Sequence, residues 1–167
     1  VKLNGNYYWV DTTFGDPIFS HEYSNNTNYN YFCVSDEELL KNHTIDKNVS
    51  LQNYNTIYNV FSYPSCVDDS LNYYKIKKCY FYYYNKQEIE DFLKNKMENG
   101  IYTDIEIKFS DNESFKEFIR DFLDSENSGI MDVIKEQNPD FYGSINVSYS
   151  FVESSNFLRL SMVLNPS

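Results

Sequence analysis

The first residues of the chain carry a two-residue period that predicts a strand over residues 7–11. Three side chains of this strand share one face: Tyr7, Trp9 and Asp11. The pair Asn4-Gly5 separates the strand from residues 1–3, and it predicts a tight hairpin because both residues must take positive φ. Gly15 and the Asp16-Pro17 pair then end the strand.

The rest of the first half has weaker patterns. Residues 20–30 have the Asn- and Ser-rich composition of a loop, and residues 44–59 show no clear period. Ser35 precedes three acidic residues and predicts the start of a short helix, because anions are favoured at a helix N-terminus. Glu38 completes a capping box with Ser35, and the helix is expected to end near Asn42.

The second half of the chain has longer and more regular periods. Alternating or β-rich runs predict strands, and apolar residues at helical spacing predict helices. The predicted order is strand, helix, strand, two helices and a terminal hairpin, over residues 79–84, 85–100, 101–109, 110–123, 130–136, 145–151 and 158–164. Asn85 with Glu88 and Ser110 with Glu113 are expected to begin the first two helices as capping boxes.

These elements predict an α+β fold for the second half. A strand-helix-strand unit with short connections pairs its strands in parallel through a right-handed crossover. The helices are then expected to cover one face of a mixed sheet, with Met131 and Ile134 inward in the last helix. We place the domain boundary near residue 70. The predicted domains are therefore residues 1–70 and residues 71–167, the second with the order β-α-β-α-α-β-β.

Composition and charge narrow the classes of function. The chain has 167 residues, of which 41% are hydrophobic and 19% aromatic, enough for a sizeable core. The net charge is −11, and repulsion from phosphate argues against binding to nucleic acid or to an anionic membrane. No apolar run is long enough to span a membrane. The sequence has neither a glycine-rich phosphate loop nor metal-ligand spacing, so no cofactor and no metal are expected.

The cysteines and histidines of the chain are expected to have structural positions. His21 lies in a polar loop and His43 near the end of a short helix, so both are interpreted as solvated or capping residues. Cys33 is expected to be a small buried hydrophobic residue. A disulfide between Cys66 and Cys79 stays open, because it depends on an oxidising compartment.

Three segments, in chain order, resemble a known family. Residues 3–17 resemble the strand that ends Val-Asp-x-Thr-x-x-Asp-Pro in transglutaminase-like core domains. Residues 31–44 resemble the family's Tyr-Phe-x-Val-Ser-Asp-Glu-Glu segment with its following Asp-His-Thr, and residues 64–74 resemble a later Pro-x-Cys run followed by Asn-Tyr-Tyr. The resemblance implies that residues 1–70 are the remnant of a transglutaminase-like, papain-like core.

The resemblance also implies a role for Asp11. The family's catalytic set is Cys-His-Asp in chain order, and Asp11 occupies the third position, where a carboxylate orients the histidine and stabilises the imidazolium. The cysteine and the histidine are expected before Val1. The chain is therefore expected to be a C-terminal fragment that is not catalytically competent. The whole protein is expected to be a bacterial cysteine hydrolase or acyltransferase acting on peptide or protein amides.

Alternatives remain open for both the residue and the chain. Asp11 can instead cap its own turn by accepting hydrogen bonds from backbone amides near Thr13. The chain can instead be a non-catalytic protein- or carbohydrate-binding module of a bacterial surface protein, or a structural appendage. Tyrosines within residues 80–84 would form the binding platform, although packing in the sheet is the plainer interpretation. The sequence leaves a secreted or cell-surface location and the oligomeric state undecided.

Overall fold

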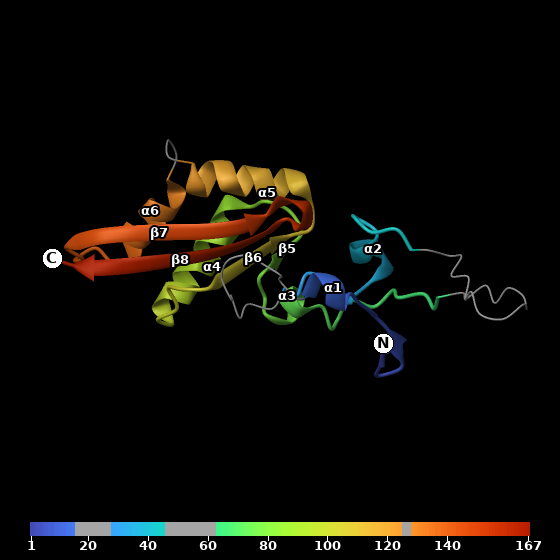
Figure 1. Ribbon diagram of the computed structural model, residues 1–167. Helices are drawn as coiled ribbons and strands as arrows, with labels where there is room; N and C mark the ends of the chain where they lie inside the picture. Colours follow the sequence, from blue (N-terminus) through green and yellow to red (C-terminus); the bar gives the residue numbers. More distant parts are fainter. Residues whose placement is uncertain (16–27, 46–62, 125–127) are drawn as a thin grey trace, which may run out of the picture. The chain divides into compact units, whose positions relative to one another are not determined.

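The computed structural model describes residues 1–15, 28–45, 63–124 and 128–167 (Figure 1). The chain divides into two compact units, Val1–Ile76 and Lys77–Ser167, which we call the first and the second unit. The first unit extends beyond residue 70 because it includes the short helix α3 (Tyr73–Ile76). His21 and most of the predicted loop residues 20–30 and 44–59 lie outside the described residues.

The first unit opens with the predicted hairpin. Strand β1 (Lys2–Leu3) pairs antiparallel with β2 (Asn6–Tyr7), which confirms the predicted hairpin. The single strand predicted over residues 7–11 is instead divided at Tyr8, because the segments on either side of it pair with different strands. The two turn residues have positive φ, 51° at Asn4 and 89° at Gly5, as an Asn-Gly hairpin requires. Strand β3 (Trp9–Val10) and the single-turn helix α1 (Thr12–Gly15) follow.

A second, shorter pairing brings distant residues beside β3. Strand β4 (Phe32–Val34) runs antiparallel to β3, with Trp9 opposite Val34 and the register shifted between Trp9 and Val10. Cys33 has φ 55°, and an extra residue with positive φ is typical of a β-bulge. Helix α2 (Asp36–Leu39) follows and ends before the expected Asn42. The small core of this unit contains Tyr31, Val34 and Leu39, with Trp9 and Ile45 packed against it.

The second unit contains a four-stranded mixed sheet. Its strands are β5 (Tyr80–Phe81), β6 (Ile105–Phe109), β7 (Gly143–Val152) and β8 (Phe157–Pro166). They lie in the order β5-β6-β8-β7. Strands β5 and β6 are parallel, as the strand-helix-strand prediction required, and the other two pairings are antiparallel. The one-turn helix η2 (Glu153–Ser155) connects β7 to β8.

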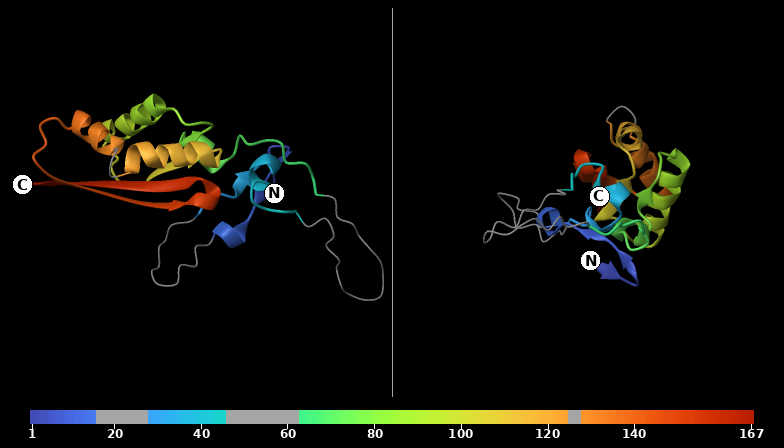
Figure 2. Two further views of the ribbon diagram at one scale, coloured as in Figure 1. Left: turned by 90° about the horizontal axis from the view of Figure 1, so that it is seen from above. Right: turned by 90° about the vertical axis from the view of Figure 1, so that its right-hand side faces the viewer.

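Three helices cover one face of this sheet, as predicted (Figure 2). They are α4 (Lys86–Glu98), α5 (Asn112–Phe118), which continues into the π-helical turn η1 (Ile119–Leu123), and α6 (Gly129–Gln137). The core between helices and sheet is rich in phenylalanine and aliphatic residues. It includes Ile89, Leu93, Ile105, Ile107, Phe109, Phe115, Phe118, Phe122, Ile134, Leu158 and Leu160. The α+β fold class is thus confirmed for the second half.

Several details of the second unit differ from the prediction. Strand β6 begins at Ile105 instead of residue 101. Strand β5 ends at Phe81 instead of residue 84, because its neighbour β6 ends at the paired residue Phe109. Helix α5 is capped by Asp111 instead of Ser110: the Asp111 carboxylate accepts from the Ser114 amide at 2.8 Å. In α6 the fully inward residues are Ile130, Val133 and Ile134, while Met131 is only partly buried.

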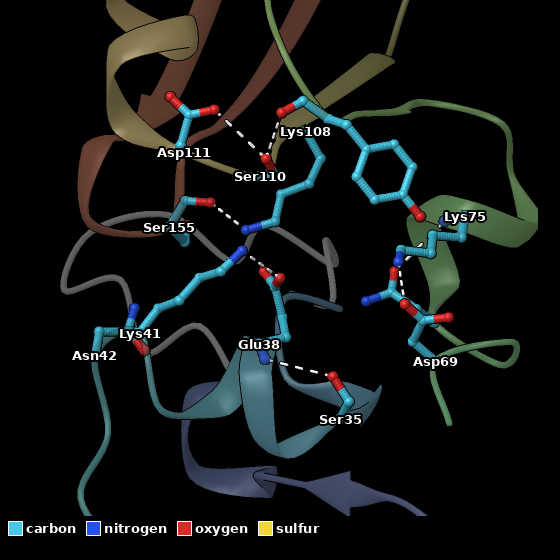
Figure 3. A network of polar contacts seen from close by, with 12 residues as sticks. Ser35, Glu38, Lys41, Asn42, Asp69, Lys75, Lys108, Ser110, Asp111 and Ser155 are labelled. Atoms are coloured by element: carbon cyan, nitrogen blue, oxygen red, sulfur yellow. Dashed lines mark hydrogen bonds and ion pairs between the residues drawn. The ribbon is translucent and has the colours of Figure 1, made fainter. Parts of the chain in front are cut away.

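The other face of the sheet carries charged side chains with partners. Glu106 on β6 and Arg159 on β8 lie opposite each other and form an ion pair of 3.0 Å. Lys108 is only 3% exposed, and its ammonium group donates to the Ser155 carbonyl in η2 (Figure 3). The ion pair and the hydrogen bond give partners to charged side chains that are largely buried, where an unpaired charge would be costly.

Within the described residues, no helix is long and apolar enough to cross a membrane.

Candidate functional site

Asp11 lies between strand β3 and helix α1. Its backbone amide donates to the Tyr31 carbonyl at 3.0 Å, which continues the pairing of β3 with the segment before β4. Its Oδ1 accepts from the backbone amides of Thr13 at 2.8 Å and Phe14 at 3.2 Å. The expectation that Asp11 can cap its own turn is therefore confirmed for one of its two oxygens.

The second oxygen of Asp11 faces a histidine ring. Nε2 of His43 lies 3.3 Å from Oδ2 of Asp11, and the two side chains are 18% and 25% exposed, respectively. The interpretation of His43 as a solvated or capping residue was wrong, because the ring is packed edge-on against Tyr31 and Phe14, with centroid distances of 4.4 and 5.2 Å. The turn after α2 folds His43 back onto β3, and no period in the sequence indicates such a turn.

The side chain of Asn42 orients the His43 ring through its Nδ1 atom. Nδ1 lies 2.7 Å from the side-chain oxygen of Asn42, whose amide nitrogen donates to the Tyr31 hydroxyl at 2.6 Å. With the Asn42 amide in this orientation, Nδ1 carries a hydrogen. In the neutral ring, Nε2 then faces the Asp11 carboxylate with a lone pair. In the imidazolium, Nε2 carries an N–H, and only this form is attracted to the carboxylate.

The contact between the two side chains is electrostatic rather than a well-aligned hydrogen bond. Nε2 of His43 is buried, and it has no hydrogen bond of good geometry to any described residue, although Oδ2 of Asp11 is within ion-pair distance. In the imidazolium form, a small rotation of the ring would align the Nε2–H with the carboxylate.

An open cavity of about 300 Å³ lies beside this pair, entirely within the first unit. Aromatic and aliphatic side chains form much of its wall, and the polar groups come from Asp11 and its neighbours. The lining residues are Trp9, Val10, Asp11, Thr12, Leu39, His43, Thr44, Ile45 and Tyr63. A concave site with an apolar wall and a few converging polar groups is typical of a binding or active site.

The carboxylate of Asp36 fixes the wall of the cavity. Its Oδ1 accepts from the Trp9 indole N–H at 2.6 Å, and its Oδ2 accepts from the Cys66 backbone amide at 3.0 Å. The Trp9 ring also packs at 5.3 Å from the ring of Tyr63. From the sequence, Asp36 was predicted only to be an acid in the first turn of α2. Its hydrogen bonds to Trp9 and Cys66 depend on the tertiary fold and have no local sequence signal.

The neighbouring first turn of α2 has the predicted cap. The Ser35 hydroxyl accepts from the Glu38 amide at 3.4 Å, and the Glu38 carboxylate binds the Lys41 ammonium at 2.7 Å (Figure 3). The cap and the ion pair hold the start of the turn that brings His43 to Asp11.

None of the cysteines is placed as a nucleophile. Cys33, Cys66 and Cys79 are free and buried. Burial raises the pKa of Cys33 and, together with the charge of Asp36, that of Cys66. Burial raises the pKa of Cys79 to about 12. Because the thiolate is the reactive form, these thiols are held in their inert state.

The tyrosines within residues 80–84 divide into two kinds. Tyr82 and Tyr83 are 62% and 64% exposed, so these rings are not packed in the sheet. Tyr84 instead donates its hydroxyl to Asp121 at 2.7 Å, and burial followed by this contact raises the pKa of the phenol. Among the described residues, no group of three or more His, Cys, Asp or Glu side chains is arranged to hold a metal ion.

A comparison of the chain with protein-family models gives no match, and neither does a comparison with curated proteins.

Proposed function

We propose that the chain is the C-terminal part of a transglutaminase-like cysteine hydrolase or acyltransferase that acts on peptide or protein amides, with Asp11 as its acidic residue. The observation that carries the proposal is the geometry of the Asp11 carboxylate. Oδ1 is held by two backbone amides, while Oδ2 points to an imidazole nitrogen at 3.3 Å beside a cavity. An acid that orients a histidine ring must itself be held by hydrogen bonds while one oxygen stays directed at the ring, and Oδ1 of Asp11 supplies this hold.

The strand pairing supports the position of a catalytic histidine in a longer protein. Val1 and Tyr8 exchange both backbone hydrogen bonds, at 2.8 and 2.9 Å, as a directly opposed antiparallel pair does. Residues preceding Val1 would continue this ladder in the antiparallel direction, alongside Trp9, Val10 and Asp11. A histidine on that strand would approach the Asp11 carboxylate from the edge opposite β4.

His43 has a supporting role in this proposal. It belongs to the His-Thr pair of the second resembling segment, while the family's catalytic histidine precedes the aspartate. When its ring is an imidazolium, its contact with Oδ2 adds to the two backbone hydrogen bonds that already orient the carboxylate. A carboxylate oxygen has more than one acceptor site, so Oδ2 can face His43 and a second imidazole together.

The test is the substitution Asp11→Asn in a protein that includes the residues encoded before Val1. Asparagine keeps the shape but no longer stabilises an imidazolium, so kcat on a peptide amide should fall by roughly 10²- to 10⁴-fold with little change in KM. Asp140→Asn is the matched control, because it removes an exposed carboxylate in the second unit. The chain of 167 residues by itself should form no thioester with the same substrate.

An unchanged kcat in the Asp11→Asn protein would contradict the proposal. The alternative is then a non-catalytic protein- or carbohydrate-binding module. The observation that favours it is the exposure of two neighbouring aromatic rings, Tyr82 at 62% and Tyr83 at 64%. Such rings supply apolar area together with a polar hydroxyl, which suits both sugars and peptides.

A further inference from the structure

Strand β7 is the outermost strand of the sheet in the second unit. It pairs along its whole length with β8, through ten consecutive residue pairs from Gly143–Pro166 to Val152–Phe157 with no register shift (Figure 1). No other strand of the described chain pairs with its second edge. Of its ten residues, eight are exposed and two are half-buried. The outer edge thus presents a long, regular row of backbone donors and acceptors.

The sequence of β7 lacks the features that usually protect such an edge. Natural sheets block edge pairing with charged side chains, prolines, bulges or very short strands. Residues 143–152 contain neither a charged residue nor a proline, in a chain that has 25 acidic and 14 basic residues. The strand itself therefore brings no charged side chain to this edge, which is left free of local charge repulsion.

The strand is also complementary to itself in the antiparallel direction. With Ser148 opposite Ser148 of a second copy, Val147 lies opposite Tyr149 and Ile145 lies opposite Phe151. Aromatic residues opposite β-branched residues are favourable cross-strand pairs. On the other face the same register places Asn146 opposite Ser150, so polar side chains meet polar side chains. A two-fold axis through Ser148 requires no other partner sequence.

We propose that β7 pairs antiparallel with β7 of a second copy of this chain, about a two-fold axis at Ser148, and joins two four-stranded sheets into one. The pairing adds backbone hydrogen bonds and the aromatic contacts of Tyr149 and Phe151, which are 45% and 50% exposed in the single chain. Because each copy carries a net charge of −11, salt should strengthen the association by screening the repulsion between the two molecules.

The first experiment measures the mass of the chain by analytical ultracentrifugation over a range of protein and salt concentrations. The unsubstituted chain should shift from monomer to dimer as either concentration rises. Ser148→Lys and Ser148→Glu should each remain monomeric, because each places like charges opposite one another at the axis. An equimolar mixture of the two variants should form the mixed dimer, since opposite charges then meet.

The matched control is Val163→Lys. Val163 is 46% exposed and lies opposite Asn146 on the same face of the sheet, but on β8, one strand in from the edge. This variant should dimerise as the unsubstituted chain does. A chain that stays monomeric at every concentration would overturn the proposal. The partner of the β7 edge would then have to be a strand of a different protein. Dimers of Ser148→Lys as stable as the unsubstituted dimer would overturn it as well.

A second measurement needs no substitution. Hydrogen exchange of peptides covering residues 143–152 should slow as the protein concentration rises, because the outward amides of β7 become hydrogen-bonded in the dimer. Peptides from α4 should exchange at a rate independent of concentration. Slower exchange confined to α4, or no change in β7 under conditions where ultracentrifugation shows a dimer, would place the interface elsewhere and overturn the proposal.

Discussion

At the level of single residues, Asp36 joins three segments that are far apart in sequence. It begins helix α2, accepts from the indole of Trp9 at 2.6 Å and accepts from the amide of Cys66 at 3.0 Å. Hydrogen bonds to an ionised acceptor are stronger than neutral ones, and removing the carboxylate takes the acceptor from the Trp9 and Cys66 N–H groups and from the Ser65 hydroxyl. The cavity wall formed by Trp9 therefore depends on a carboxylate outside the cavity.

Asp36→Ala should lower the free energy of unfolding of the first unit by about 2–3 kcal/mol, because the donors of Trp9, Cys66 and Ser65 lose their acceptor. Trp9 is the one tryptophan of the chain, so its fluorescence during urea unfolding reports on this unit directly. Glu37→Ala is the control, since Glu37 is an exposed acid in the same helical turn. It should change stability by less than about 0.5 kcal/mol. Equal losses in the two variants would show that the helix N-terminus, and not the Trp9 contact, accounts for the effect.

The pairing of Asp11 with His43 shows what single-residue patterns leave out. The turn-capping oxygen of Asp11 follows from local sequence, since an aspartate before Thr12-Thr13 can bond the amides that come next. The contact of the other oxygen depends on a bulged strand pairing and on the turn after α2, which bring residues 11 and 43 together. Neither feature has a sequence period, so local patterns could not have predicted it.

At the level of elements, the helices of the second unit were the most predictable part. Asn85 caps α4 through the amide of Glu88 at 3.2 Å. Of the four residues whose spacing predicts the inner face of α4, Ile89, Leu93 and Met97 are buried, and Phe92 is partly buried against the same core. The ends of the strands were less predictable, because a strand ends where its neighbour does. Tyr82 and Tyr83 continue the β-rich sequence of β5. They are not part of the strand, because β6 ends at Phe109, the residue that pairs with Phe81.

In the first unit, strand β2 and the residue after it are held by the carboxylate of Asp68. Tyr8 is 2% exposed, and its hydroxyl donates to Asp68 at 2.6 Å; Asn6 donates to the same oxygen. The Ser70 amide donates to the other oxygen at 2.8 Å. These hydrogen bonds, the one from Tyr8 foremost, lower the pKa of Asp68 from 3.8 to about 2.

The lowered pKa of Asp68 predicts acid sensitivity of the first unit. A carboxyl whose pKa is lower in the folded state adds stability above its unfolded value near 3.8, and this stability is lost as the pH falls toward about 2. The urea midpoint followed by Trp9 fluorescence should therefore fall between about pH 4 and pH 2. Asp68→Asn should be less stable at neutral pH and show a flatter profile in this range. A profile with the same slope in both proteins would assign the acid sensitivity to other carboxyls.

At the level of the whole molecule, the described parts of the two units contain cores of different size. Among the residues that the structure describes, sixteen buried residues form the core cluster of the second unit, whereas three form that of the first, with two partly buried residues beside them. Burial of apolar surface is the main favourable contribution to folding, so the sixteen-residue core gives the second unit a large internal source of stability. Its helices, sheet and capping residues also come from one continuous segment, Lys77–Ser167.

We therefore expect the segment Lys77–Ser167 to fold when it is produced alone. It should keep a mixed helix-strand circular dichroism spectrum and unfold cooperatively in urea, because every residue of its core cluster lies within it. Phe118→Ala should lower its stability by about 3–5 kcal/mol, since the ring is fully buried between Phe109 and Phe122. Ile101→Ala, at a residue 41% exposed, should have a much smaller effect. A segment without a cooperative transition would show that its core needs residues of the first unit, and the two compact units would then be one folding unit.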